Sequence, residues 1–252
     1  MDNIINPLLI QIFLLVLVLV FAHTVETVLG FGASLITMAL GVYIFPINAL
    51  LPVVVILGFL QSCWLVARWI RHLKWRALLM NIMPAVAVGM IAGIYYRTQV
   101  ASYKQLLILL GLFVMAVSIM EIFLIYRTRS AGGSLPKYLG WPILIVGGLF
   151  HGIYATGSPL IIYYSSRELK EPAEFRATIS MLWLILNLVL FFNLYASGLI
   201  NVNTITTTGI VLPGLIAGII LGNSMKFRAV VFKFLVYVLL FFAGLLLLFQ
   251  PG

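Results

Sequence analysis

Long apolar runs constrain this chain more than any other feature. A transmembrane helix needs about 20 consecutive apolar residues. Of the 252 residues, 63% are hydrophobic and 8% are charged, which leaves no stretch for a sizeable soluble domain. The sequence therefore predicts an all-α integral membrane protein. The apolar segments cover roughly residues 7–28, 33–45, 49–67, 77–96, 104–126, 138–152, 158–165, 176–196, 204–222 and 229–249.

The formal net charge of +9 does not indicate a nucleic-acid partner. The Lys and Arg residues lie in short connections between apolar runs, where membrane topology explains them. Cys63 is the single cysteine and lies inside an apolar run, so neither a disulfide framework nor a metal-ligand spacing is present. The N-terminus lacks the positive region of a signal peptide, and residues 7–22 are expected to be retained. No cofactor or metal is predicted.

Two apolar runs are interrupted in a way that predicts broken helices. In the second half, the stretch from His151 to Pro159 separates the run that begins near residue 138 from the one that resumes at residue 160. We expect Ser158 to be the N-cap and Pro159 the first residue of a new helix. The first half has its own version at residues 29–34, including Gly30 and Gly32. Such helix starts direct unpaired N–H groups into the membrane interior, where a small anion could bind.

An internal repeat is visible in the sequence itself. Pro84, Gly89 and Gly93 recur 129 positions later, and at the same offset Arg97 matches Lys226. Near the two breaks the offset becomes 125, so that Gly32 matches Gly157. At this offset Glu26 and His151 are also equivalent. A duplication is predicted, with the first membrane repeat at residues 1–130 and the second at residues 131–252.

The distribution of Lys and Arg predicts how the repeats are oriented. If residues 138–165 crossed the membrane once, the positive residues would divide almost evenly between the two sides. If they instead form a re-entrant hairpin, only Arg97 and Lys104 lie outside and the other thirteen lie inside. Each repeat then has a hairpin plus three transmembrane helices, and the two repeats are inverted with both termini outside. Residues 7–28 are long enough to span alone, so the first hairpin depends on the repeat.

Two histidines and one carboxylate at membrane depth are candidates for chemistry. His23 and Glu26 are three residues apart and would share one helix face. They could form a proton-coupling pair, or Glu26 could be an interfacial carboxylate paired with backbone. His151 could be a protonatable donor beside an anion, or a core histidine bonded to a carbonyl. His72 is expected in a solvated loop.

Small and hydroxylated residues surround both breaks and are the predicted substrate-binding residues. Hydroxyl groups can donate to an anion alongside backbone N–H groups, although plain helix capping is the alternative. Gln61, Ser62 and Asn187 are expected to hydrogen-bond between helices instead. The predicted binding set, with His151 included, is Gly32, Ala33, Ser34, Thr37, Thr156, Gly157 and Ser158.

The chain resembles the TauE/SafE sulfite exporter family. The resemblance lies in the hairpin breaks, in residues 150–160, in Phe175-Arg176-Ala177 and in the duplicated Pro-x4-Gly-x3-Gly helix. It covers nearly the whole chain. It implies a bacterial inner-membrane protein that moves sulfite, sulfonates or related anions.

These observations predict a secondary transporter that exports a small anion, with the two helix starts holding its head group. A passive anion channel, a membrane-embedded enzyme and a structural scaffold are the alternatives. The sequence has no Walker-type loop, no zinc ligand set and no Ser-His-Asp order, so an ATP-driven pump is not expected. A transporter is predicted rather than an enzyme. The expected partners are the anion, the lipid bilayer and possible homodimerisation with a second copy.

Overall fold

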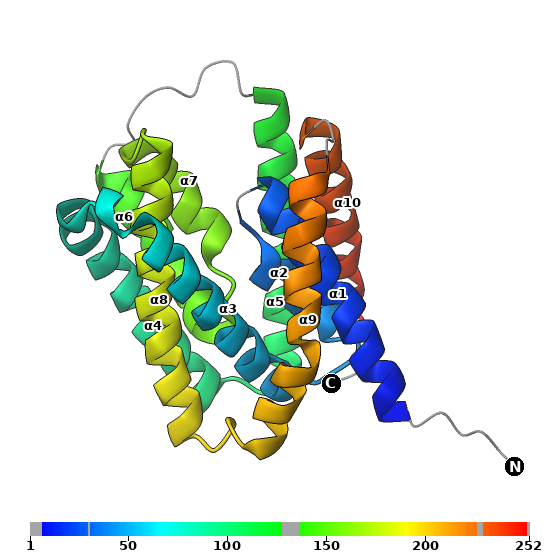
Figure 1. Ribbon diagram of the computed structural model, residues 1–252. Coiled ribbons are helices and arrows are strands. Elements are labelled where there is room, and N and C mark those ends of the chain that lie inside the picture. Colours follow the sequence, from blue (N-terminus) through cyan, green and yellow to red (C-terminus); the bar gives the residue numbers. More distant parts are fainter. Residues whose placement is uncertain (1–6, 30, 128–136, 226–228, 251–252) are drawn as a thin grey trace, which may run out of the picture.

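The computed structural model describes residues 7–29, 31–127, 137–225 and 229–250, and this part of the chain is helical without a strand. Seven helices in the described residues are long and apolar enough to cross a membrane, which confirms the all-α membrane fold (Figure 1). The α-helices are α1 (Pro7–Leu29), α2 (Ala33–Gly41), α3 (Ile47–Trp69), α4 (Met83–Tyr95), α5 (Tyr103–Arg127), α6 (Lys137–Tyr154), α7 (Ser158–Glu168), α8 (Pro172–Ala196), α9 (Val202–Ser224) and α10 (Ala229–Leu247). Three short segments are 3₁₀ or π helix: η1 (Ile70–His72), η2 (Ala77–Ile82) and η3 (Tyr96–Val100).

The helix ends follow local signals in the sequence. Pro46 directly precedes α3 and Pro172 opens α8, where a missing N–H costs nothing. Asn201 caps α9, because its side-chain oxygen accepts a hydrogen bond from the Thr204 N–H at 3.0 Å. Residues of this kind fix where an apolar helix begins, whatever it packs against later.

The two ends of the molecule differ in the residues of their loops. At the charged end, defined by residues 70–76 and 169–171, Lys74 forms an ion pair with Glu174 at 2.7 Å. At the far end, defined by residues 42–46 and 197–201, Pro46 and Asn201 line a common pocket. Helix α1 begins and α10 ends at the far end, which is at the bottom of Figure 1.

The two hairpins begin at opposite ends of the molecule. A Cβ on Gly140 would lie 2.3 Å from the Tyr164 ring, so the start of α6 lies beside the end of α7, near the charged end. Helix α1 begins at the far end and α2 turns back towards it (Figure 1). The placement of these ends relative to a membrane, and the inverted repeat as a whole, stay predictions. Helix α1 has 23 residues and is long enough to cross by itself.

Each hairpin packs against a helix of the other half, and the packing repeats with the offsets seen in the sequence. A Cβ on Gly89 of α4 would lie 1.9 Å from the Ile145 carbonyl oxygen of α6. A Cβ on Gly218 of α9 would lie 2.7 Å from the Val20 carbonyl oxygen of α1. The glycines are 129 positions apart and their partners are 125 apart. One turn further along these helices, the pairing recurs between Gly93 and Leu149 and between Gly222 and Thr24.

The predicted boundary between the repeats, at residues 130 and 131, lies outside the described residues.

Candidate functional site

The second hairpin is interrupted where the sequence predicts. Helix α6 ends at Tyr154, Ala155 takes a left-handed backbone conformation with φ 57°, and α7 begins at Ser158. A Cβ on Gly157 would lie 1.8 Å from the Gly147 carbonyl oxygen, so glycine lets the two arms approach this closely. Tyr154 fixes the end of α6 by donating its hydroxyl to the Leu106 carbonyl of α5 at 2.6 Å.

The predicted N-cap at this break is wrong by one residue. Gly157 is the N-cap of α7, Ser158 is already helical, and Pro159 is the second helical residue. No side chain caps the helix. The close approach of Gly157 to the other arm starts the helical turn one residue earlier, and the Ser158 hydroxyl is released from capping.

Several buried polar atoms around this break have no hydrogen-bond partner within the described residues. They are both ring nitrogens of His151, Thr156 Oγ1 and Ser158 Oγ. His151 is 3% exposed and Thr156 is fully buried. The imidazole of His151 stacks on Trp183 of α8, with ring centroids 5.4 Å apart and planes 22° apart. One expectation was that the His151 ring bonds a carbonyl, but no such bond is present within the described residues.

The start of α7 adds backbone donors to these side chains. The first N–H groups of a helix have no partner within it, and the helix dipole places partial positive charge there. Leaving a buried polar group without a partner costs about 1–3 kcal/mol. Hydroxyls, an imidazole and free N–H groups gathered at one point would all be satisfied by a small anion.

The first break also lies where the sequence predicts. Gly32 has φ 109°, a left-handed conformation that favours glycine, and it precedes α2 without a side-chain cap. Ala33 and Thr37 are buried and Ser34 is half-buried. Gly30, part of the predicted break, lies outside the described residues.

Glu26 lies beside two possible proton or hydrogen-bond partners. His23, which is 4% exposed, places its Nδ1 atom 3.3 Å from Glu26 Oε2, so the two residues share a face as expected. Gln61 of α3 donates from Nε2 to the same carboxylate oxygen at 3.2 Å. The sequence predicts that Gln61 forms a hydrogen bond between helices. In the structure, Glu26 of α1 accepts that hydrogen bond.

Helices α3 and α8 show that Glu26 and His151, which match each other in the sequence repeat, lie at one level. The two helices are antiparallel and meet where Gly58 faces Asn187, with a Cβ on Gly58 lying 3.0 Å from the Asn187 amide nitrogen. Gln61 and Trp183 each lie one turn from this contact, in the same direction. Glu26, bonded to Gln61, and His151, stacked on Trp183, are therefore at about the same depth.

Each break follows its histidine or carboxylate by the same number of residues. Gly32 lies six residues after Glu26 and Gly157 six residues after His151. The second break turns back on itself, because a Cβ on Gly157 would lie 3.1 Å from the His151 Cβ. The expectation that both helix starts hold one small anion between them stays a prediction.

The structure also places an ion pair beside the first break. Lys233 of α10 pairs with Glu121 of α5 at 2.6 Å, and Glu121 is 4% exposed. The Lys233 ammonium lies 5.8 Å from the centroid of the Phe31 ring, next to Gly32. The positive charge at this break is thus neutralised by a carboxylate of the protein. Nothing in the sequence around Lys233 indicates this partner.

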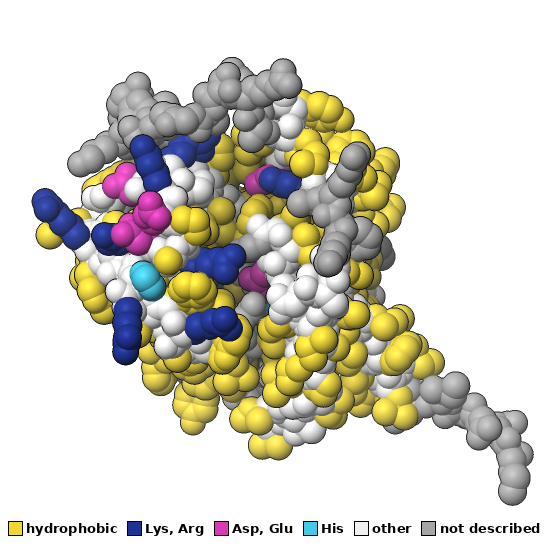
Figure 2. Space-filling model, turned by 45° about the horizontal axis from the view of Figure 1, so that its top comes forward, with side chains coloured by type: hydrophobic (Ala, Val, Ile, Leu, Met, Phe, Trp, Pro, Cys, Tyr) yellow, Lys and Arg dark blue, Asp and Glu magenta, His cyan; other side chains and the backbone are white. Residues whose placement is uncertain are grey.

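Charged side chains gather on the face that includes the charged end (Figure 2). Arg167 stacks on Tyr163 at 3.8 Å, and Asn81 donates to Glu168 at 2.7 Å. The predicted concentration of positive residues at one end includes Arg129, Lys226 and Arg228, which lie outside the described residues.

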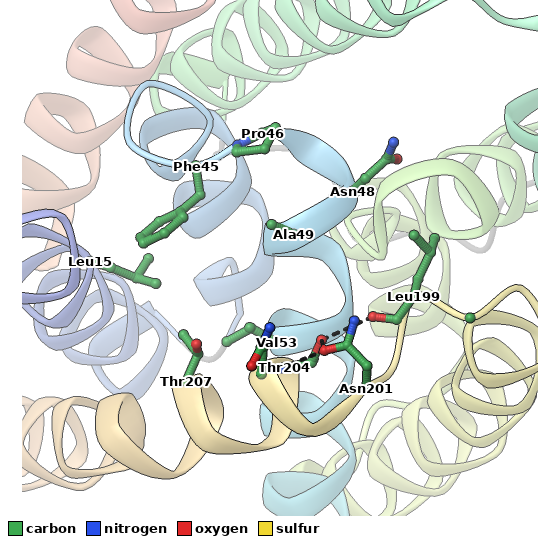
Figure 3. Close-up of a pocket in the computed structure, with 12 residues that line it drawn as sticks. Leu15, Phe45, Pro46, Asn48, Ala49, Val53, Leu199, Asn201, Thr204 and Thr207 are labelled. Carbon is green, nitrogen blue, oxygen red and sulfur yellow. Dashed lines mark hydrogen bonds between the residues drawn. The ribbon is translucent and has the colours of Figure 1, made fainter. Parts of the chain in front are cut away.

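A pocket of about 340 Å³ opens at the far end (Figure 3). Asn48 and Thr207 line it together with apolar Leu15 and Phe45, and no charged side chain contributes. The Thr204 hydroxyl donates to the Asn201 side-chain oxygen and to the Leu199 carbonyl (Figure 3).

The class that this fold defines is a polytopic helical membrane protein with two interrupted hairpins. The chain belongs to the sulfite exporter TauE/SafE family, which it matches over residues 15–247. This match confirms the resemblance noted from the sequence.

Two curated relatives agree with this class. A stretch of 160 residues is 29% identical to the "Probable inner membrane transporter protein TsaS" of Comamonas testosteroni, covering 62% of this chain and 63% of that protein. A stretch of 169 residues is 24% identical to the "Probable sulfite/organosulfonate exporter TauE" of Cupriavidus necator, covering 65% of this chain and 64% of that protein. The chain therefore spans just under two thirds of each relative's length. No solved structure matches it.

Proposed function

We propose that this chain is a secondary transporter of the bacterial inner membrane that exports a small oxoanion, sulfite or an organosulfonate. The observation that carries the proposal is the set of unpartnered buried donors of His151, Thr156 and Ser158 at the start of α7. An anion bound there would satisfy them. The printed name of the Cupriavidus relative supports the choice of sulfite or an organosulfonate.

Proton coupling is assigned to the first hairpin. Glu26 accepts from Gln61 and lies beside His23, while its side chain remains 27% exposed. A carboxylate that is half-buried and reachable from water can exchange a proton with the solvent. Movement of one repeat against the other, with the charged end facing the cytoplasm, would give alternating access.

The binding site is tested by removing a hydroxyl without changing shape. Thr156→Val deletes a buried hydroxyl that has no hydrogen-bond partner among the described residues, so the stability of the variant should be unchanged or higher. Its anion binding should weaken. Thr208→Val is the matched control, because that hydroxyl is also buried but donates to the Thr204 carbonyl at 2.8 Å.

The assay is thermal unfolding of purified protein with sulfite, sulfoacetate, taurine, thiosulfate, formate or chloride. An anion at a hundred times its Kd stabilises the folded state by about 2.7 kcal/mol. No shift with any of these anions would refute the proposed substrate class. A full shift in Thr156→Val would remove the second break from the site.

Coupling is tested separately by flux into proteoliposomes. In Glu26→Gln the carboxylate can no longer take up a proton, so transport should lose its pH dependence while the anion still binds. An unaltered pH profile would assign Glu26 a structural role.

A further inference from the structure

Two guanidinium groups stack on one tryptophan beside the charged end. The Arg68 guanidinium carbon, in the last turn of α3, lies 5.9 Å from the centroid of the Trp69 ring and 5.7 Å from that of the Trp64 ring. The guanidinium carbon of Arg176, near the start of α8, lies 5.8 Å from the centroid of the same Trp69 ring. The adjoining ends of two helices thus gather two permanent positive charges around a single indole.

Neither arginine has a carboxylate partner among the described residues, whose ion pairs are those of His23, Lys74 and Lys233. The carboxylate closest to Arg176 in the sequence, that of Glu174, is already paired with Lys74 at 2.7 Å. Stacking on a ring occupies only the flat face of a guanidinium and leaves the five N–H donors at its edge. An anion with two oxygens in reach can therefore bind to these edges through parallel hydrogen bonds.

Arg68 lies on the face of α3 that is turned to the outside of the molecule. Leu60 and Trp64 precede it by about two turns and one turn, and their side chains are 45% and 54% exposed. Residues four apart in a helix share one face. Because α3 belongs to an apolar span that ends at His72, this exposed face is a lipid-facing surface, and Arg68 lies where it reaches the edge of the membrane.

This position favours a lipid phosphate over a dissolved anion as the ligand. Tryptophan is enriched at the level of the lipid headgroups, because its ring is apolar and its N–H is polar. Trp75, at the same end of the molecule, is also 52% exposed. Acyl chains lying against Leu60 and Trp64 would bring the phosphate of their own headgroup to Arg68.

We propose that Arg68, Trp69 and Arg176 form a binding site for the phosphate of an anionic phospholipid. The two guanidinium groups donate to the phosphate oxygens, Trp69 positions both groups, and the acyl chains lie along the exposed face of α3. Because one arginine belongs to α3 and the other to α8, a bound lipid ties the ends of these two helices together. The site is separate from both helix breaks and does not depend on the proposed function.

The experiment measures lipid binding to the purified full chain by native mass spectrometry. The probes are dioleoyl phosphatidylglycerol, which is anionic, and dioleoyl phosphatidylcholine, whose choline cancels the phosphate charge. The double variant Arg68→Gln with Arg176→Gln should raise the Kd of phosphatidylglycerol on the order of tenfold and leave that of phosphatidylcholine unchanged. Trp69→Leu removes no charge, yet it should raise the Kd of phosphatidylglycerol about threefold, because both guanidinium groups lose the ring that positions them.

The matched control is Arg71→Gln with Arg76→Gln, which removes two exposed positive charges from the same end of the molecule. Its Kd for phosphatidylglycerol should stay within about threefold of wild type. If the glutamine variants do not fold, Arg68→Lys with Arg176→Lys keeps the charges but not the planar edges, and should still weaken binding.

Three results would overturn the inference. Equal losses in the two double glutamine variants would show a diffuse effect of charge without a defined site. Equal Kd values for the two lipids in the wild type would show that the headgroup charge is not recognised. Displacement of phosphatidylglycerol by inorganic phosphate or sulfite at millimolar concentration would assign the two arginines to a dissolved anion.

Discussion

Gly157→Ala tests whether the second hairpin is as tightly closed as the structure indicates. The added Cβ would lie 1.8 Å from the Gly147 carbonyl oxygen and 3.1 Å from the His151 Cβ. Ordinary contacts begin at 3.4 Å, so the two arms must separate by about 1.5 Å, at a cost of about 1–3 kcal/mol for overpacking. Gly157 has φ −68°, which alanine adopts freely, so the cost is purely steric.

The matched control is Gly209→Ala in α9, where a Cβ meets no atom within 4 Å. This variant should be stabilised by up to about 1 kcal/mol, since alanine is the better helix former. Stability is measured by unfolding in detergent with increasing SDS, and anion binding by thermal shift. Because the separation of the arms displaces His151, Gly157→Ala should also bind the anion more weakly. If Gly157→Ala were as stable as Gly209→Ala, the close packing of the hairpin would be refuted.

Three further predictions concern the supports of the two breaks. Gly32→Ala should cost about 1–2 kcal/mol through its left-handed backbone although no atom is within 4 Å, and Gly32→Asn should cost less in the same SDS titration; equal stabilities would contradict the strain argument. Lys233→Gln leaves the Glu121 carboxylate buried and should cost about 3 kcal/mol, much of it recovered when Glu121→Gln is added, and additive losses would show that the pair is not coupled. Tyr154→Phe loses its bond to the Leu106 carbonyl and should cost about 1 kcal/mol; an unchanged unfolding midpoint would show that the bond does not hold the end of α6.

Local signals accounted for the helices and the interruptions. Apolar length predicted the spans, and glycine with proline predicted the breaks before α2 and α7. These features depend on backbone conformation and on the cost of polar groups in lipid, both of which act within a few residues. The repeat with its two offsets was also visible, and the contacts of Gly89 and Gly218 reproduce it in space.

The partners of the polar residues could not be predicted in the same way. Gln61 and Arg97 were visible as polar residues in or near membrane spans. Nothing local indicates that Gln61 bonds Glu26 or that Arg97 bonds Asn193. The Ser158 cap was misplaced for a related reason, because the contact of Gly157 with the opposite arm set the helix start.

The sequence by itself determined an all-α membrane protein with two broken helices, and it predicted a duplicated plan and an anion site. Only the tertiary structure decided which helix packs against which, and so brought Gln61 to Glu26 and Trp183 to His151. Hydropathy does not predict which helices pack together, because burying an apolar helix surface against lipid or against another helix is about equally favourable. Close backbone contacts at a few glycines select the partner, and those contacts exist only once the chain has folded.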